Sequence, residues 1–261
     1  MIDLSNKRAL VCGASAGIGR ACAEAFAQCG AAVTLLARNE AAMKDVCAGL
    51  DRSRGQTHAW LAADLAKPES ARAAAAAHVA QVGPIHILVN NTGGPPAGPL
   101  YEATPEAILA ALQAHVVTAH LLTQALLPGM TAEKYGRIIN IISTSVIAPI
   151  KGLGVSSTTR GAMANWGRAM AGELGPRGIT VNNILPGYTS TERLNSLVTR
   201  VAATGGTSEQ HVTADWAGKI PLGRFADPSE IGTVAAFLAS SAASYISGVN
   251  LPVDGGRTAW Q

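Results

Sequence analysis

The stretch Gly13-Ala14-Ser15-Ala16-Gly17-Ile18-Gly19 decides how this chain folds. It follows an apolar run over 8–12 and precedes a helical pattern over 18–28. Glycines between a strand and a helix let the backbone approach a pyrophosphate, and the helix N-terminus offers it unpaired N–H groups. Because glycine-rich turns also occur for steric reasons alone, the rest of the chain has to support this phosphate site.

The alternation of apolar run and helical pattern continues to the end of the chain. Apolar strands separated by helices indicate a parallel sheet covered on both faces, so we expect an α/β fold of one domain over residues 1–261. A long irregular stretch, roughly 186–222, is predicted to be a substrate flap. Strands are predicted at 8–12, 32–36, 56–62, 85–90, 137–142, 180–184 and 249–253, and helices at 18–28, 41–50, 70–82, 105–127, 158–174 and 229–238.

The composition and charge of the chain indicate which partners and which cellular location to expect. Residues are 48% hydrophobic and 14% charged, which favours extensive burial and a homo-oligomer, a tetramer before a dimer. A net charge of +3 without a Lys/Arg run predicts neither nucleic acid nor a membrane as partner, so we expect a small-molecule substrate. The N-terminus lacks a signal-peptide pattern, so we expect a cytoplasmic protein. Cysteines and histidines lack metal-site spacing, and the cysteines are expected to be reduced core residues: Cys12, Cys22, Cys29 and Cys47.

Further motifs appear in a fixed order along the chain. With the Gly-x-x-x-Gly-x-Gly loop they make the chain resemble the short-chain dehydrogenase/reductase family, in particular 3-oxoacyl-acyl-carrier-protein reductases, over essentially its whole length. The resemblance implies a single-domain Rossmann fold, a seven-stranded parallel sheet of order 3-2-1-4-5-6-7 with helices on both faces. The motifs are Asp64 after the third strand, Asn90-Asn91-Thr92-Gly93 after the fourth, Pro186-Gly187-Tyr188-Thr189-Ser190-Thr191, and Val253-Asp254-Gly255-Gly256.

This resemblance implies a nicotinamide dinucleotide, and the end of the second strand favours NADP(H) over NAD(H). An acidic residue there would repel the extra phosphate, whereas Arg38 offers it a planar donor fork. The alternative is that Arg38 only begins the next helix in solvent, and Ala16 lacks a second basic side chain. The cofactor-binding residues so implied are Gly13, Ser15, Ala16, Gly17, Ile18, Gly19, Arg38, Asp64, Leu65, Asn91, Gly93, Arg160, Pro186, Gly187, Thr189 and Thr191.

The chain departs from the family at its catalytic tetrad. Tyr-x-x-x-Lys does not occur in the sequence, but the flanking helix aligns without a gap. Ser156 then occupies the Tyr position and Arg160 the Lys position, Ser143 keeps the polarising Ser, and His115 replaces the Asn. A serine hydroxyl is a poor proton donor, and a permanently charged arginine cannot relay a proton.

Other groups are candidates for the missing proton donor. His115, with an ordinary pKa near 6.5, would exchange protons at neutral pH. The alternative is a helix histidine that is satisfied in the core or at a subunit contact. Tyr188 and Tyr101 lie in segments that would overhang the pocket, and Tyr188 is preferred because it directly follows Pro186-Gly187. A stripe at helical spacing is assigned to oligomerisation, as in the family: Met163, Trp166, Met170 and Leu174.

Three functions are therefore compatible with the sequence. The first is an NADP(H)-dependent oxidoreductase of a small carbonyl or hydroxyl compound that uses His115, Tyr188 or water for proton transfer. The second is a lyase, retro-aldolase, dehydratase or isomerase in the same pocket. The third is a catalytically inactive NADP-binding protein.

Overall fold

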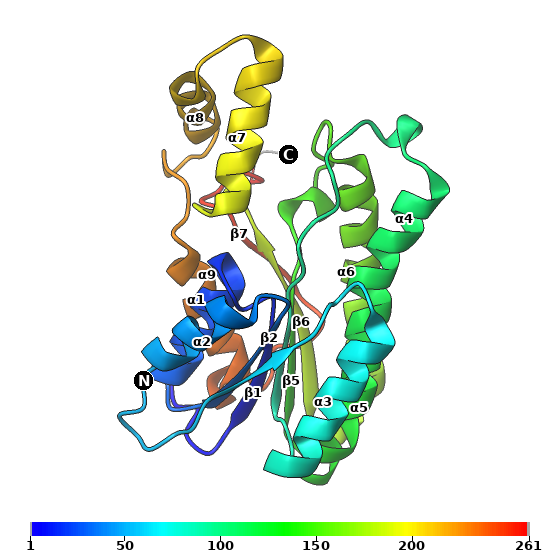
Figure 1. The fold of residues 1–261 in the computed structure, drawn as a ribbon, viewed down its shortest axis with the longest axis vertical. Helices are drawn as coiled ribbons and strands as arrows, with labels where there is room; N and C mark the ends of the chain where they lie inside the picture. Colours follow the sequence, from blue (N-terminus) through cyan, green and yellow to red (C-terminus); the bar gives the residue numbers. More distant parts are fainter. Residues whose placement is uncertain (1, 260–261) are drawn as a thin grey trace.

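The sheet has seven parallel strands in the predicted order β3-β2-β1-β4-β5-β6-β7, in a computed structural model that describes residues 2–259 (Figure 1). Because all the strand pairs are parallel, the carboxyl ends of the strands meet at one edge, and the helices of the crossovers cover the two faces. The strands are β1 (Arg8–Cys12), β2 (Ala32–Ala37), β3 (Ala59–Ala62), β4 (Ile87–Asn90), β5 (Gly136–Ile141), β6 (Ile179–Pro186) and β7 (Asn250–Val253).

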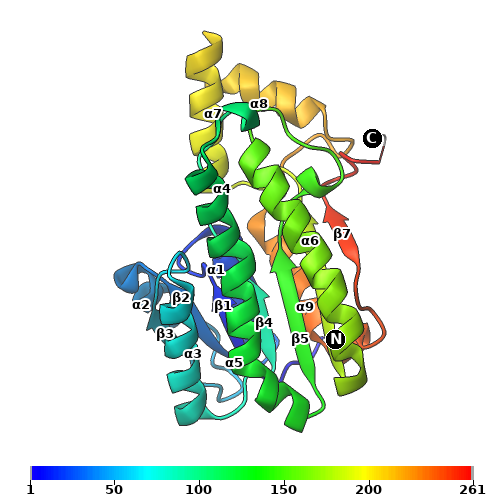
Figure 2. The ribbon, with the colours of Figure 1, turned by 90° about the vertical axis from the view of Figure 1, so that its right-hand side faces the viewer.

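Helices cover both faces of this sheet, as Figures 1 and 2 show from two sides. Alternate residues of β1 point to opposite faces: Ala9 and Val11 join one apolar core, Leu10 and Cys12 the other. One face carries α1 (Gly17–Gln28), α2 (Glu40–Gly49) and α9 (Pro228–Ala239), and the other α3 (Pro68–Val82), α4 (Pro105–Leu112), α5 (Thr118–Ala132) and α6 (Gly154–Leu174).

The segment after β6 differs from the prediction of an irregular stretch. It contains two helices, α7 (Glu192–Gly205) and α8 (Glu209–Gly218), which stand above the carboxyl edge of the sheet (Figure 1). Thr191 caps α7 by accepting from the Leu194 N–H, and Ser208 caps α8 by accepting from the His211 N–H. These helix start signals lie in a polar sequence and were not used in the prediction.

Several other boundaries differ from the prediction by up to five residues, and two of them have local reasons. β3 begins at Ala59 and not at 56, because the side chain of Gln56 donates to the carbonyl oxygens of Ala27 in α1 and Asp51, and His58 Nε2 bonds to that of Asp51. The helix predicted over 105–127 is continuous to Ala132, but a π-helical turn, η2 (Gln113–Val117), joins α4 to α5. By length and apolar composition alone this helix qualifies as a membrane span, yet it packs against α3 and β5 as part of the fold.

The stripe assigned to oligomerisation belongs partly to this chain's own core. Met163 and Leu174 are buried against neighbouring elements, because α6 lies along β6, whereas Trp166 and Met170 are half-buried. The cysteines are free thiols, and Cys12, Cys22 and Cys47 are buried as predicted, while Cys29 is partly exposed.

Candidate active site

A groove of about 1000 Å³ runs along the carboxyl edge of the sheet beside the glycine loop. It contains most of the residues implied for the cofactor. Arg160, Pro186, Gly187 and Thr189 instead line the adjoining cavity, and Gly19 is buried beneath the loop. The implied residues that line the groove are Gly13, Ser15, Ala16, Gly17, Ile18, Arg38, Asp64, Leu65, Asn91, Gly93 and Thr191.

The glycine loop has a shape that larger residues cannot adopt. Gly13 has φ +60°, and a Cβ there would come within 2.6 Å of the Asn91 carbonyl oxygen. A Cβ on Gly19 would collide with the Gly13 carbonyl oxygen and lie 2.7 Å from Asn91 Nδ2. The Asn91 amide also donates to the carbonyl oxygens of Cys12 and Gly13, both at 3.3 Å. The loop and the end of β4 are thus packed as one unit.

The N-terminus of α1 opens into this groove without a capping side chain. Its N-cap residue, Ala16, makes no side-chain hydrogen bond, and the first turn holds no acidic residue. By contrast, side chains of Thr191 and Asp227 cap α7 and α9. Free N–H groups at a helix terminus favour an anionic group, so the groove fits the pyrophosphate of a dinucleotide.

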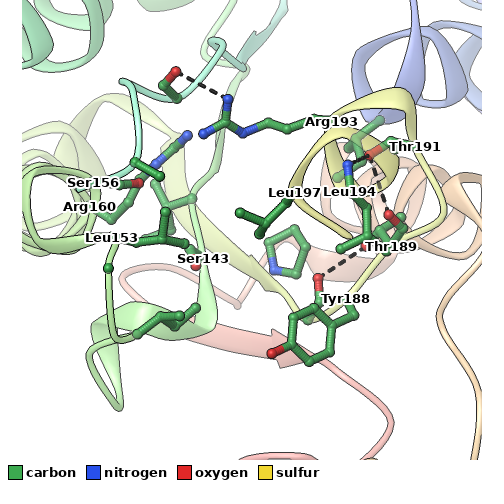
Figure 3. A pocket seen from close by; sticks show the side chains of 18 of the residues that line it. Ser143, Leu153, Ser156, Arg160, Tyr188, Thr189, Thr191, Arg193, Leu194 and Leu197 are labelled. Atoms are coloured by element: carbon green, nitrogen blue, oxygen red, sulfur yellow. Dashed lines mark hydrogen bonds between the residues drawn. The ribbon is translucent and has the colours of Figure 1, made fainter. Parts of the chain in front are cut away.

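A second cavity, of about 450 Å³, adjoins the groove and brings together most of the predicted catalytic positions. Ser143, Ser156, Arg160 and Tyr188 all line it (Figure 3). Its walls come from β5 and β6, from α6, and from α7. The two spaces share Ile18, Asn91, Thr92, Gly94, Thr191 and Arg193.

Arg160 is buried, and its hydrogen bonds go to main-chain oxygens. Nη1 donates to the Ile141 carbonyl at 2.9 Å, and Nη2 donates to the Thr92 carbonyl at 3.3 Å. Burial, together with the nearby charge of Arg193, lowers the pKa of Arg160 to about 10. It therefore stays cationic at neutral pH and lies between the ends of β4 and β5.

The hydroxyl groups at the cavity have different surroundings. Ser143 Oγ accepts a hydrogen bond from the Ser145 N–H at 3.1 Å, which leaves its O–H to donate toward the cavity. Ser156 lies one helical turn before Arg160 on the same face of α6. Tyr188 stacks on Trp216 with ring centroids 4.8 Å apart, and the Arg257 guanidinium lies 4.8 Å from its ring centre.

His115 lies near Arg160 and the main chain of Gly93, but its side chain is buried. It sits in the π-helical turn η2 with 5% of its surface exposed, and it is not among the described residues that line either space. Burial lowers its pKa to about 3, and the charges of Arg160 and Arg193 act in the same direction. His115 is therefore a neutral imidazole at pH 7, which removes the argument that it exchanges protons there.

The basic side chains of α7 were not predicted to belong to the site. Arg193 and Arg200 line the cavity and reach carbonyl oxygens of the segment after β4. Their spacing of seven residues places them on one face of a helix, but this signal requires recognising a helix within 186–222. Lys151 and Trp216 also line the cavity and were not predicted.

Known proteins match this chain over almost its whole length. The family model described as enoyl-(acyl carrier protein) reductase matches residues 13–258. An uncharacterized oxidoreductase of Mycobacterium tuberculosis is 35% identical over 99% of this chain and 94% of its own length. The 3-oxoacyl-[acyl-carrier-protein] reductase of Vibrio cholerae is 33% identical over 98% of each chain.

Solved structures also resemble the chain over almost its whole length. L-sorbose reductase from Gluconobacter frateurii, complexed with NADPH and L-sorbose, has a TM-score of 0.92 at 30% identity and covers 98% of both chains. Gluconate 5-dehydrogenase from Burkholderia cenocepacia, in complex with NADP and tartrate, has a TM-score of 0.88 at 31% identity and covers 100% of this chain and 98% of that one. The chain therefore belongs to the short-chain dehydrogenase/reductase family of oxidoreductases.

Proposed function

We propose that this chain is an NADP(H)-dependent oxidoreductase that interconverts a carbonyl and a hydroxyl group on a small molecule, with Tyr188 as its proton donor. The observation that carries the proposal is the junction of the dinucleotide groove with a cavity that holds Ser143, Ser156, Arg160 and Tyr188. Relatives that were solved with NADPH or NADP support the choice of cofactor.

Each residue of the cavity has a role in the proposed reaction that its chemistry permits. When bound, NADPH supplies a hydride for the carbonyl carbon. Ser143 donates a hydrogen bond to the carbonyl oxygen, and that oxygen takes the Tyr188 proton, so the product is an alcohol. Arg160 is held to main-chain oxygens and keeps its charge, so it orients the ribose and cannot deliver the proton.

Tyr188 is favoured over His115 by position and by ionisation. Of the tyrosines in the described chain, it is the one that lines the cavity, whereas Tyr101 is 87% exposed. His115 is buried outside the cavity, and its low pKa leaves it without a proton to give at neutral pH. Arg38, exposed at the groove beyond β2, supports a preference for NADP(H) because it meets the added phosphate.

The test follows NADPH oxidation over a panel of aldehydes, ketones and imines, with product analysis in parallel. Tyr188→Phe keeps the ring stacked on Trp216 and removes the proton, so turnover should fall at least about tenfold with a changed pH profile. Tyr101→Phe is the matched control and should leave turnover unchanged. Equal rates for wild type and Tyr188→Phe contradict the assignment of the donor.

The same panel separates the other reaction classes. Products formed without net NADPH oxidation would replace the oxidoreductase by a lyase or isomerase that works in this pocket. Tight NADPH binding with no product from any compound would favour a cofactor-binding protein without catalysis.

A further inference from the structure

The cavity beside the dinucleotide groove carries several positive charges and no carboxylate among its described residues. Lys151, Arg160, Arg193 and Arg200 line it, and no Asp or Glu does. Glu192, the neighbour of Arg193, lines the groove and not the cavity. Arg193 also lines the dinucleotide groove and Arg160 is assigned to the ribose, but neither the cofactor nor a neutral carbonyl compound accounts for Lys151 and Arg200.

The arginines of this cavity are bonded to weak, neutral acceptors. Arg193 donates to the carbonyl oxygens of Gly94 and Pro95 at 3.3 and 3.2 Å, and Arg200 donates to that of Ala97 at 3.5 Å. Ion pairs such as Arg54 with Asp3, at 2.9 Å, occur elsewhere in the chain. Hydrogen bonds of a guanidinium to a carboxylate or phosphate are shorter and roughly twice as strong as neutral ones. An anion in the cavity would therefore compete well for these donors.

Two of these charges face one another from opposite walls. Figure 3 shows the guanidinium of Arg160 on α6 directed toward that of Arg193 on α7. Leu153, Leu194 and Leu197 form apolar surface beside them, which weakens screening by water. Like charges in such a setting repel, and the repulsion contributes to the lowered pKa of Arg160. A negative group placed between them would relieve this cost.

We propose that the substrate of this site is an anionic carbonyl compound, whose carboxylate or phosphate group binds to Arg193 and Arg200 of α7 with Arg160 opposite. The carbonyl oxygen then lies at Ser143, on the wall formed by the end of β5. This inference rests on the proposed function for the statement that the bound anion is a substrate. The anion site itself is independent of the reaction.

Calorimetric titration of the NADPH-loaded protein tests the site with matched pairs of compounds. The carboxylate arm uses 2-oxopentanoate and 4-oxopentanoate against their methyl esters, and the phosphate arm uses dihydroxyacetone phosphate against dihydroxyacetone. At least one anion should bind about tenfold or more tightly than its neutral partner. Arg193→Gln and Arg200→Gln should each raise its Kd about 10- to 100-fold. Arg168 is exposed on α6 and does not line the cavity, so Arg168→Gln is the control and should leave the Kd of the anion unchanged.

The outcomes separate the anion site from the reaction. No preference for any anion over its neutral partner overturns the site, even if neutral ketones are reduced. A preference that Arg193→Gln and Arg200→Gln abolish, with no NADPH oxidation, keeps the site and overturns the oxidoreductase. Arg200 does not line the dinucleotide groove, so Arg200→Gln should leave the Kd for NADPH unchanged. If it weakens NADPH as much as the anions, the charges serve the cofactor and the proposal is wrong.

Discussion

Arg160 Nη1 donates to the carbonyl oxygen of Ile141, 2.9 Å away at the end of β5. The Arg160 side chain is thus fixed to the sheet at Ile141, which lies two residues before Ser143 in the chain. Nη2 reaches the end of β4 through the Thr92 carbonyl oxygen. The two bonds make Arg160 part of the framework that joins the dinucleotide groove to the cavity.

The glycine loop predicts a sharp difference between two Gly→Ala substitutions in helices. Gly19→Ala places a methyl group against the Gly13 carbonyl oxygen and 2.7 Å from Asn91 Nδ2, so the loop must shift. We expect at least about a tenfold loss of NADPH affinity in calorimetric titration, because the loss of close backbone contact costs more than one charged hydrogen bond. Gly49→Ala in α2 meets no atom within 4 Å and should leave NADPH binding unchanged. Equal NADPH affinities of the two variants would mean that the glycine loop can shift to accept the methyl group without loss of binding.

Arg38 predicts the cofactor preference. Arg38→Ala should weaken NADPH by about 10- to 100-fold and NADH by much less, since only NADPH offers a second phosphate to the guanidinium. Calorimetric titration of both cofactors measures the ratio. Arg20, exposed on α1 and paired with Glu24, provides the control Arg20→Ala. Equal losses for NADPH and NADH would assign Arg38 a structural role.

The fold was predictable because short, largely apolar strands alternate with helices from β1 through β6. The glycine loop and Asp64 lie at successive strand ends, which the parallel sheet brings to one edge. The helices of 186–222 were missed because their polar caps, Thr191 and Ser208, resemble loop residues in isolation. The setting of His115 depends on burial and on charges from α6 and α7, which no local pattern contains.

His115 predicts a pH-dependent stability. Its folded pKa, about 3, lies below the unfolded value near 6.5, so the unfolded state binds more protons between these values. Its neutral form therefore contributes full stability above pH 6.5, and this contribution falls as the pH drops toward 3. At pH 5 the loss relative to pH 7 is about 2 kcal/mol from this group.

Urea unfolding at pH 7 and pH 5 measures this effect. His115→Asn should make the loss of unfolding free energy between the two pH values smaller by up to about 2 kcal/mol. His211→Asn, exposed on α8, should leave the loss unchanged. Identical acid sensitivity of His115→Asn and wild type would show that His115 is not desolvated in the folded protein.

The composition and the family resemblance predict a homo-oligomer, a tetramer before a dimer, and exposed apolar side chains on the helix 105–132 offer a surface to test. Leu109 is 64% exposed and Val117 is 43% exposed. The helix that carries them packs beside α6 on the same face of the sheet. Burying them against another copy removes apolar surface from water. Light scattering should give a multiple of 26.6 kDa for wild type, and Leu109→Glu with Val117→Glu should lower it. Leu222→Glu, 67% exposed and remote in sequence, is the control. A monomeric wild type at micromolar concentration contradicts the prediction.

The double variant Ser156→Tyr with Arg160→Lys tests whether the cavity still accepts the family's donor pair. Both positions line the cavity from one face of α6, four residues apart, so the new phenol and ammonium would lie together beside Ser143. A neighbouring cation lowers a tyrosine pKa toward neutrality, which makes the phenol a better proton donor. Arg160→Lys alone is the matched control, because it removes the guanidinium without supplying a phenol.

The expected outcome is a rise in NADPH-dependent carbonyl reduction for the double variant over Arg160→Lys. The rise should persist when Tyr188→Phe is added, because the new phenol replaces that of Tyr188. A double variant that binds NADPH with wild-type affinity but reduces no faster than Arg160→Lys would mean that Ser143 does not hold the carbonyl within reach of position 156. The wild-type reaction would then depend on the Tyr188 side of the cavity, and the proton would have to arrive from that wall.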